Sequence, residues 1–94
     1  MKVNICGIPY KIKYKRVIQE EEPGIGEGLI IYSKQEIQIR EGLAKEIKKE
    51  TLTHEIIHGI LTHMGRQSLS EDEEFVQGLA NAIYQTFELR RGKS

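Results

Sequence analysis

The chain has little cysteine and proline, no tryptophan and no long apolar run. Its single cysteine, Cys6, excludes an internal disulfide and a cysteine-rich zinc knuckle. No run of about 18 apolar residues is present, so no transmembrane helix is expected, and residues 1–10 lack the apolar stretch of a secretory signal. We therefore expect a cytoplasmic protein in a reducing compartment, with no membrane partner.

An excess of charge of one sign is also lacking. Fourteen basic and fourteen acidic side chains give a formal net charge of zero, and the aromatic residues are four tyrosines and two phenylalanines. Direct binding of nucleic acid is therefore not expected. The 94 residues, 38% of them hydrophobic, suit one domain spanning residues 1–94, so any function must reside on a single core.

Alternation of apolar and polar residues predicts a β-hairpin at the start of the chain. The alternating stretches fall within residues 3–6 and 10–18, and residues 7–9, Gly-Ile-Pro, supply the turn between them. The lysines of the second stretch would share its solvent-facing side: Lys11, Lys13 and Lys15.

Glycine and acidic residues crowd residues 20–28, which predicts a mobile loop rather than a packed element. After it, residues 29–32 and 36–40 flank the tripeptide Ser-Lys-Gln. Ile37 and Ile39 alternate with polar residues, as in a strand with one buried face. A second hairpin is therefore predicted here.

Two helices are predicted in the second half of the chain. A helical period begins near Leu43 and runs to Met64, with Gly65 placed to end it. From Leu52 onward this helix is apolar on two sides, so we expect it to be sandwiched. A last helix over about residues 71–90 has one apolar stripe, made of Phe75, Val76, Leu79, Ala80, Ile83 and Phe87. The predicted fold is α+β, with a short antiparallel sheet of two hairpins packed on the middle helix and the C-terminal helix.

Residues 54–58 read His-Glu-Ile-Ile-His in the middle of the first predicted helix. Residues four apart lie about 40° apart around an α-helix, so His54 and His58 can bind one ion. Glu55 lies about 100° from the first histidine, where it can take a proton from water on that ion without binding the ion. The alternative is a chance placement of two buried or solvated histidines. The position of the motif in a central helix favours the metal.

A catalytic zinc site needs a third protein ligand and an open position for water. His63 lies nine residues beyond the first histidine, on the opposite side of the helix, so it is not expected to bind the ion. On the last helix, Glu73 lies at the edge of the apolar stripe and is our choice, with Glu74 and Asp72 as alternatives. Residues 70–73, Ser-Glu-Asp-Glu, also match a capping box, in which Glu73 would bond back to the helix start.

Two segments of the chain carry a family resemblance. Residues 51–58 read Thr-Leu-Thr-His-Glu-Ile-Ile-His, and residues 73–80 read Glu-x-x-Val-Gln-x-Leu-Ala. They resemble the small gluzincin-type metallopeptidases, especially the ImmA/IrrE-like enzymes common in phages and mobile elements. Glu73 falls in register with the glutamate ligand of that family, while Val76 and Gln77 stand where the family has alanine and asparagine. The resemblance implies a minimal zincin-like fold.

The resemblance also implies a zinc metallopeptidase that cleaves peptide bonds, often in a repressor or another regulatory protein. His54, His58 and Glu73 would hold Zn²⁺. Glu55 would act as general base and then pass the proton to the leaving amine. The expected partner is therefore a protein or peptide substrate.

Other features of the sequence leave alternatives open. A substrate strand could pair with an exposed sheet edge at residues 36–40. Tyr84 lies on the same side as Glu73 and could orient a ligand or stabilise an oxyanion, or be half-buried core. The main competing function is a catalytically inactive zinc-binding scaffold or protein-interaction module. A structural zinc site normally has four protein ligands, whereas three are plausible here and Glu55 has no structural use, which favours hydrolysis.

Overall fold

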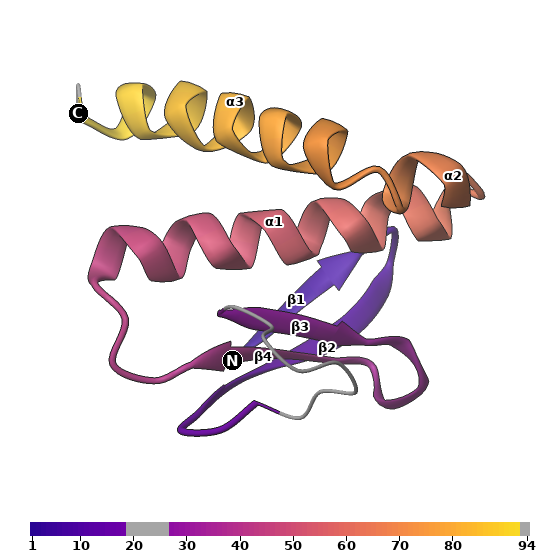
Figure 1. Cartoon of the computed structure of the whole chain (residues 1–94), viewed down its shortest axis with the longest axis horizontal. Helices are drawn as coiled ribbons and strands as arrows, with labels where there is room; N and C mark the ends of the chain where they lie inside the picture. Colours follow the sequence, from indigo (N-terminus) through magenta and orange to yellow (C-terminus); the bar gives the residue numbers. More distant parts are fainter. Residues whose placement is uncertain (19–26, 93–94) are drawn as a thin grey trace.

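Four strands form one mixed sheet in the computed structural model, which describes residues 1–18 and 27–92. The strand order is β1-β2-β4-β3 (Figure 1). The strands are β1 (Lys2–Ile5), β2 (Ile8–Lys15), β3 (Gly28–Ile31) and β4 (Glu36–Arg40). Most of the loop predicted over residues 20–28 lies outside the described residues.

The first hairpin closes through a two-residue turn. β1 and β2 pair antiparallel, and Cys6 and Gly7 between them have φ angles of 52° and 83°. Two consecutive positive φ angles are typical of a type I′ turn, whose twist matches that of the flanking strands. The predicted hairpin is confirmed. The predicted turn at residues 7–9 is wrong, because Pro9 already lies in β2, opposite Asn4.

The second hairpin joins β3 to β4 through a 3-10 helix, η1 (Tyr32–Lys34), and these strands pair antiparallel as predicted. β4 also pairs with β2, and that pairing is parallel, so the prediction of an antiparallel sheet is wrong. A parallel pair needs a long crossover, and residues 16–35, which include β3, provide it. β4 is therefore paired on both sides, and the predicted exposed edge at residues 36–40 is also wrong. The edge strands of this sheet, among the described residues, are β1 and β3.

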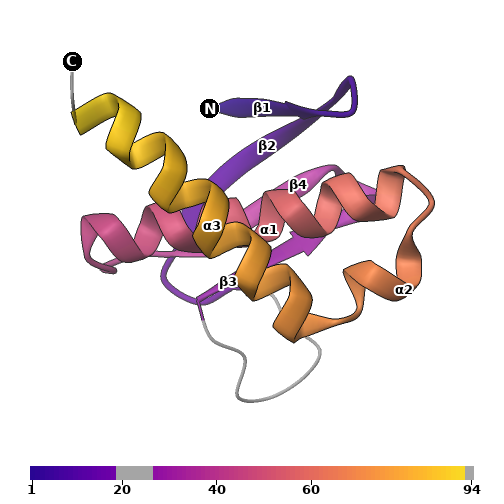
Figure 2. The ribbon, with the colours of Figure 1, turned by 90° about the horizontal axis from the view of Figure 1, so that it is seen from above.

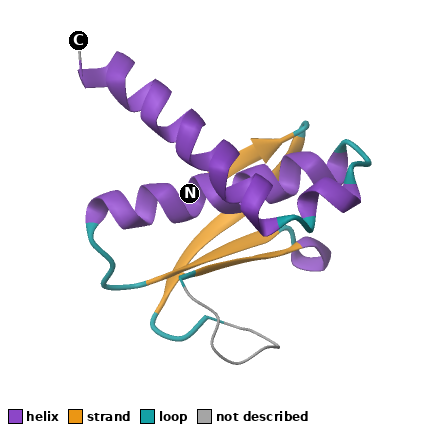
Figure 3. Cartoon of the chain, turned by 45° about the horizontal axis from the view of Figure 1, so that its top comes forward, coloured by secondary structure: helices purple, strands orange, loops and turns teal. Residues whose placement is uncertain are grey.

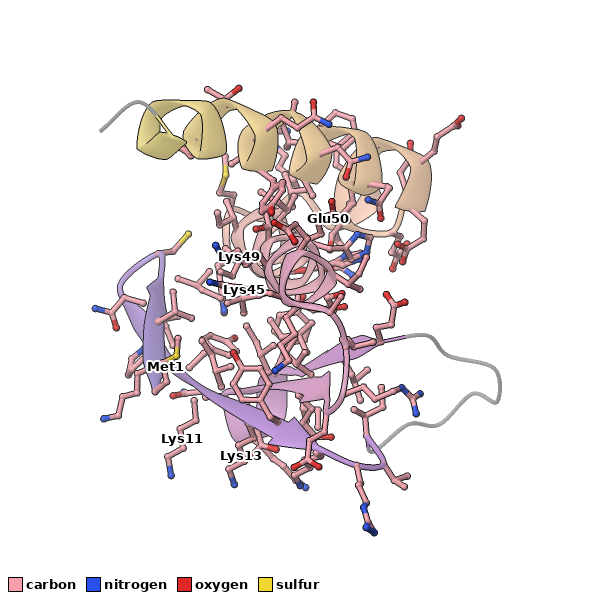
Figure 4. The ribbon with its side chains drawn as sticks, turned by 90° about the vertical axis from the view of Figure 1, so that its left-hand side faces the viewer. Met1, Lys11, Lys13, Lys45, Lys49 and Glu50 are labelled. Atoms are coloured by element: carbon pink, nitrogen blue, oxygen red, sulfur yellow. The ribbon has the colours of Figure 1, made fainter. Side chains whose placement is uncertain are left out.

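The two faces of the sheet differ in polarity. The face toward helix α1 (Lys45–His63) is apolar and buried, with Ile5, Tyr10, Ile12, Ile37 and Ile39 at its centre. The opposite face carries the predicted lysine row, in which Lys11 and Lys13 point away from the helices (Figure 4). Gln38 on this face is nevertheless fully buried, and its Nε2 donates a hydrogen bond to Oε2 of Glu36 at 2.6 Å.

Helix α1 lies between the sheet and helix α3 (Glu73–Gly92), as Figures 1 and 3 show. Two clusters of apolar side chains hold it there, one against the sheet through Leu52, Ile56 and Ile60, the other against α3 through Ile57, Leu61, Val76 and Ala80. The sandwiched position predicted for this helix is confirmed, and so is the α+β fold class.

Three apolar side chains of these helices are more exposed than the sequence predicts. Met64, Phe75 and Phe87 are 60%, 40% and 49% exposed, respectively. α3 crosses over α1 at an angle (Figure 2). Val76 and Ala80 are buried because they pack against Ile57 and Leu61 of α1, and the three exposed side chains lie outside this cluster.

Helix α1 ends where the sequence predicts. Gly65 has a φ angle of 79°, and its backbone N–H donates to the oxygen of Thr62 at 3.0 Å. The N–H of Arg66 donates to the oxygen of Leu61 at 2.8 Å, which completes a Schellman motif. A short helix, α2 (Gln67–Ser70), then leads into α3. No described helix combines the length and the apolar character needed to cross a membrane.

Candidate metal centre

The two histidines of the motif lie on the side of α1 that faces α2 and the start of α3. They are four residues apart on one helix, so their rings lie side by side, with centroids 4.8 Å apart. The His54 and His58 side chains are 18% and 13% exposed. Their Nε2 atoms are 3.2 Å apart. Both rings therefore present Nε2 to the same point.

The start of α3 brings Glu73 to this point. Oε1 of Glu73 lies 3.2 Å from Nε2 of His54 and 3.3 Å from Nε2 of His58. Asp72 caps α3, since its Oδ1 accepts a hydrogen bond from the N–H of Phe75 at 3.0 Å. Of the three carboxylates considered from the sequence, Glu73 is thus the one that reaches the histidines. Glu74 is exposed and supplies no atom to this group.

The three atoms fit a tetrahedral metal ion. They form a nearly equilateral triangle with sides of 3.2, 3.2 and 3.3 Å. Two ligands of a tetrahedral zinc ion, with bonds of about 2.0–2.1 Å, lie about 3.3 Å apart. Two imidazole nitrogens and one carboxylate oxygen are also a donor set that zinc accepts in catalytic sites. The residues present therefore fit the ion in both spacing and chemistry.

Glu55 lies beside this group and is 7% exposed. Burial, and after it the negative charge of Glu73, raises the pKa of Glu55 from 4.5 to about 7. No hydrogen bond to another described residue occupies its carboxyl group. A buried carboxyl group that can exchange a proton near neutral pH is typical of a general base.

The group opens into a pocket of about 870 Å³. Its walls come from β3, η1, α1, α2 and α3. The backbone of β3 approaches α1 closely here, because a Cβ on Gly28 would lie 2.6 Å from Cγ2 of Thr51 and 3.4 Å from Cγ of Glu55. None of the described residues that line the pocket is lysine or arginine, and five are glutamate: Glu27, Glu50, Glu55, Glu71 and Glu73.

Ser70 and Tyr32 belong to this site and were not predicted as part of it. Ser70 is 4% exposed and its Oγ lies 3.3 Å from Nδ1 of His58. Tyr32 lines the pocket and contacts Oγ1 of Thr62 at 3.1 Å. Burial raises the pKa of Tyr32. The sequence contains no spacing that links these residues to the motif, because they come from separate elements.

Two other residues considered from the sequence lie elsewhere. His63 faces away from the motif as predicted, and its Nε2 lies 2.6 Å from the hydroxyl of the buried Tyr10. Tyr84 is half-buried on α3 and does not line the pocket. The capping-box alternative for Glu73 does not apply, since Asp72 is the capping residue.

Comparisons with known protein families, curated proteins and solved structures found no match to this chain. The resemblance to gluzincin-type metallopeptidases therefore rests on residues 51–58 and 73–80 alone.

Proposed function

We propose that the protein is a zinc-dependent peptidase. His54, His58 and Glu73 hold the metal ion, and Glu55 is the general base. The observation that carries the proposal is the triangle of two nitrogens and one oxygen with sides of 3.2–3.3 Å, next to a buried carboxyl group in the same pocket.

When bound, zinc supplies a Lewis acid that activates water for attack on a peptide carbonyl group. Glu55 takes one proton from the attacking water and passes it to the nitrogen of the leaving amine as the C–N bond breaks. This role requires a carboxyl group that is not already held by other protein groups, and the side chain of Glu55 meets that requirement within the described residues.

The substrate is an extended peptide or a segment of a protein. β3 is the edge strand beside the pocket, and Leu29 and Ile30 line it, so a substrate strand paired with β3 would pass over the metal group. The lining has glutamates and no lysine or arginine among the described residues, which favours substrates with lysine or arginine near the cleaved bond.

A zinc-bound scaffold without activity is the second candidate. A closed structural site normally has four protein ligands, and the group gathered here contains three. Burial of the Glu55 side chain also disfavours its charged form, a cost that a scaffold alone would not require. These two features favour hydrolysis.

The decisive comparison is between wild type and Glu55→Gln, assayed on libraries of basic, neutral and acidic peptides. Glutamine has nearly the same shape but cannot accept the proton, so hydrolysis should fall by about 10²–10⁴-fold. Zinc content measured by elemental analysis should stay at the wild-type level. Wild type should cleave the basic peptides fastest.

Glu46→Gln is the matched control, because Glu46 is exposed in the first turn of the same helix and does not line the pocket. It should retain wild-type hydrolysis. Equal activity of wild type and Glu55→Gln, or no activity in zinc-loaded wild type on any library, would contradict the proposed hydrolysis.

A further inference from the structure

Ser70 is buried where α2 meets the metal-facing side of α1. Its Oγ lies 3.3 Å from Nδ1 of His58, 3.2 Å from the backbone oxygen of His58 and 3.0 Å from Oγ1 of Thr62. These three polar atoms, with the Tyr32 hydroxyl beside them, share one hydroxyl group, which has one proton to donate and two lone pairs to accept with.

The directions of these hydrogen bonds follow from the number of protons. A carbonyl oxygen can only accept, so Ser70 donates its one proton to the backbone oxygen of His58. Ser70 can then only accept from Thr62 and from Nδ1 of His58. Nδ1 of His58 must therefore carry a proton, which leaves the lone pair of the neutral ring on Nε2.

That lone pair is on the nitrogen that faces the other two proposed ligand atoms. A neutral imidazole binds a metal through its unprotonated nitrogen, and the hydrogen bond of the other nitrogen sets which one that is. We propose that Ser70 is a positioning residue that fixes the tautomer and the ring orientation of His58 for metal binding. The inference rests on the metal site of the proposed function but not on peptide hydrolysis.

The hydroxyl groups of Thr62 and Tyr32 extend the hydrogen-bond network around Ser70. Thr62 uses its proton on Ser70, so its oxygen accepts from the hydroxyl of Tyr32 at 3.1 Å. The three residues form a hydroxyl chain (Tyr32, Thr62 and Ser70) that runs from the pocket wall to His58. Because Ser70 donates its only proton to the backbone oxygen of His58, its contact with Nδ1 has one possible direction, which is determined before a metal ion arrives.

Zinc affinity is the first test, measured by competition with a fluorescent chelator. Ser70→Ala removes the acceptor from Nδ1 of His58 and should weaken zinc binding by about 10–100-fold. Ser68→Ala is the matched control, because Ser68 is an exposed serine on the same short helix, and its affinity should equal that of wild type. Equal affinity of Ser70→Ala and wild type would overturn the inference.

The tautomer itself is the second test, read from ¹⁵N NMR spectra of the imidazole rings in metal-free protein at mildly alkaline pH. Wild type should have the proton of His58 on Nδ1, and Ser70→Ala should have a mixture of the two tautomers. A proton on Nε2 of His58 in wild type would overturn the inference, whether or not any variant folds. Wild type that binds no zinc would instead contradict the metal site, while the NMR result would still decide the role of Ser70.

Discussion

Among the residues of the candidate site, Glu55 has the most unusual surroundings, because its carboxyl group is buried. Its pKa is raised to about 7, mainly by burial, so the folded chain binds this proton more tightly than the unfolded chain does. The metal-free protein should therefore lose stability as the pH rises from about 4.5 to about 7. At 1.36 kcal/mol per pKa unit, the loss above this window is on the order of 3 kcal/mol.

Urea unfolding in the presence of a chelator measures this loss. Glu55→Gln cannot titrate, so its free energy of unfolding should change less than that of wild type between pH 4.5 and 7. Parallel pH profiles for the two proteins would mean that the carboxyl group is solvated in the metal-free state, and that the pocket does not bury it.

Spacing along a helix allowed part of the candidate site to be predicted. Residues 54–58 share one helix, so 3.6 residues per turn fix the relation of His54 and His58. Glu73 followed from the apolar stripe of the last helix, although the choice between it and Asp72 needed the observed cap at Phe75. No sequence spacing indicated that Ser70 and Tyr32 belong to the site, because their positions depend on how α2 and η1 pack against α1.

At the scale of elements, β3 lies close to α1 along one wall of the pocket. A Cβ on Gly28 would lie 2.6 Å from Cγ2 of Thr51, and Thr51 is buried, so the Thr51 side chain or one of the two elements must shift. Gly28→Ala should lower the free energy of unfolding by about 1–3 kcal/mol.

Gly78→Ala is the control for this prediction, because Gly78 is exposed on α3 and a Cβ there would meet no atom within 4 Å. Alanine favours the helix over glycine by about 1 kcal/mol, so this variant should be more stable than wild type. Denaturant unfolding of both variants measures whether each substitution lowers or raises the free energy of unfolding. Stabilisation by Gly28→Ala would contradict the tight contact of β3 with α1.

Local sequence patterns predicted where the helices and strands lie better than they predicted which strands pair with each other. Both hairpins and the two long helices follow from alternation, from helical period and from a glycine at a helix end, all of which act over a few residues. The parallel pairing of β2 with β4 joins strands separated by residues 16–35, and alternation does not specify a partner so far away.

At the scale of the whole molecule, a formal net charge of zero conceals a local concentration of acidic residues at the pocket. Glutamates line the pocket on the helical side, while Lys11, Lys13 and Lys15 lie on the opposite face of the sheet. The composition predicted neutrality but not this local gathering of glutamates, which depends on how the sheet, α1 and α3 are layered (Figure 1). An acidic pocket is compatible with a basic peptide and disfavours an acidic one.

The central claim is that one fold gathers three metal ligands and leaves a fourth position open to this pocket. A crystal structure of the zinc-loaded protein, with anomalous scattering measured at the zinc edge, tests it most directly. The account predicts one zinc ion bonded to Nε2 of His54, Nε2 of His58 and a carboxylate oxygen of Glu73, with its remaining position facing the pocket. An ion bound elsewhere, or a fourth protein side chain that closes the coordination, would contradict it.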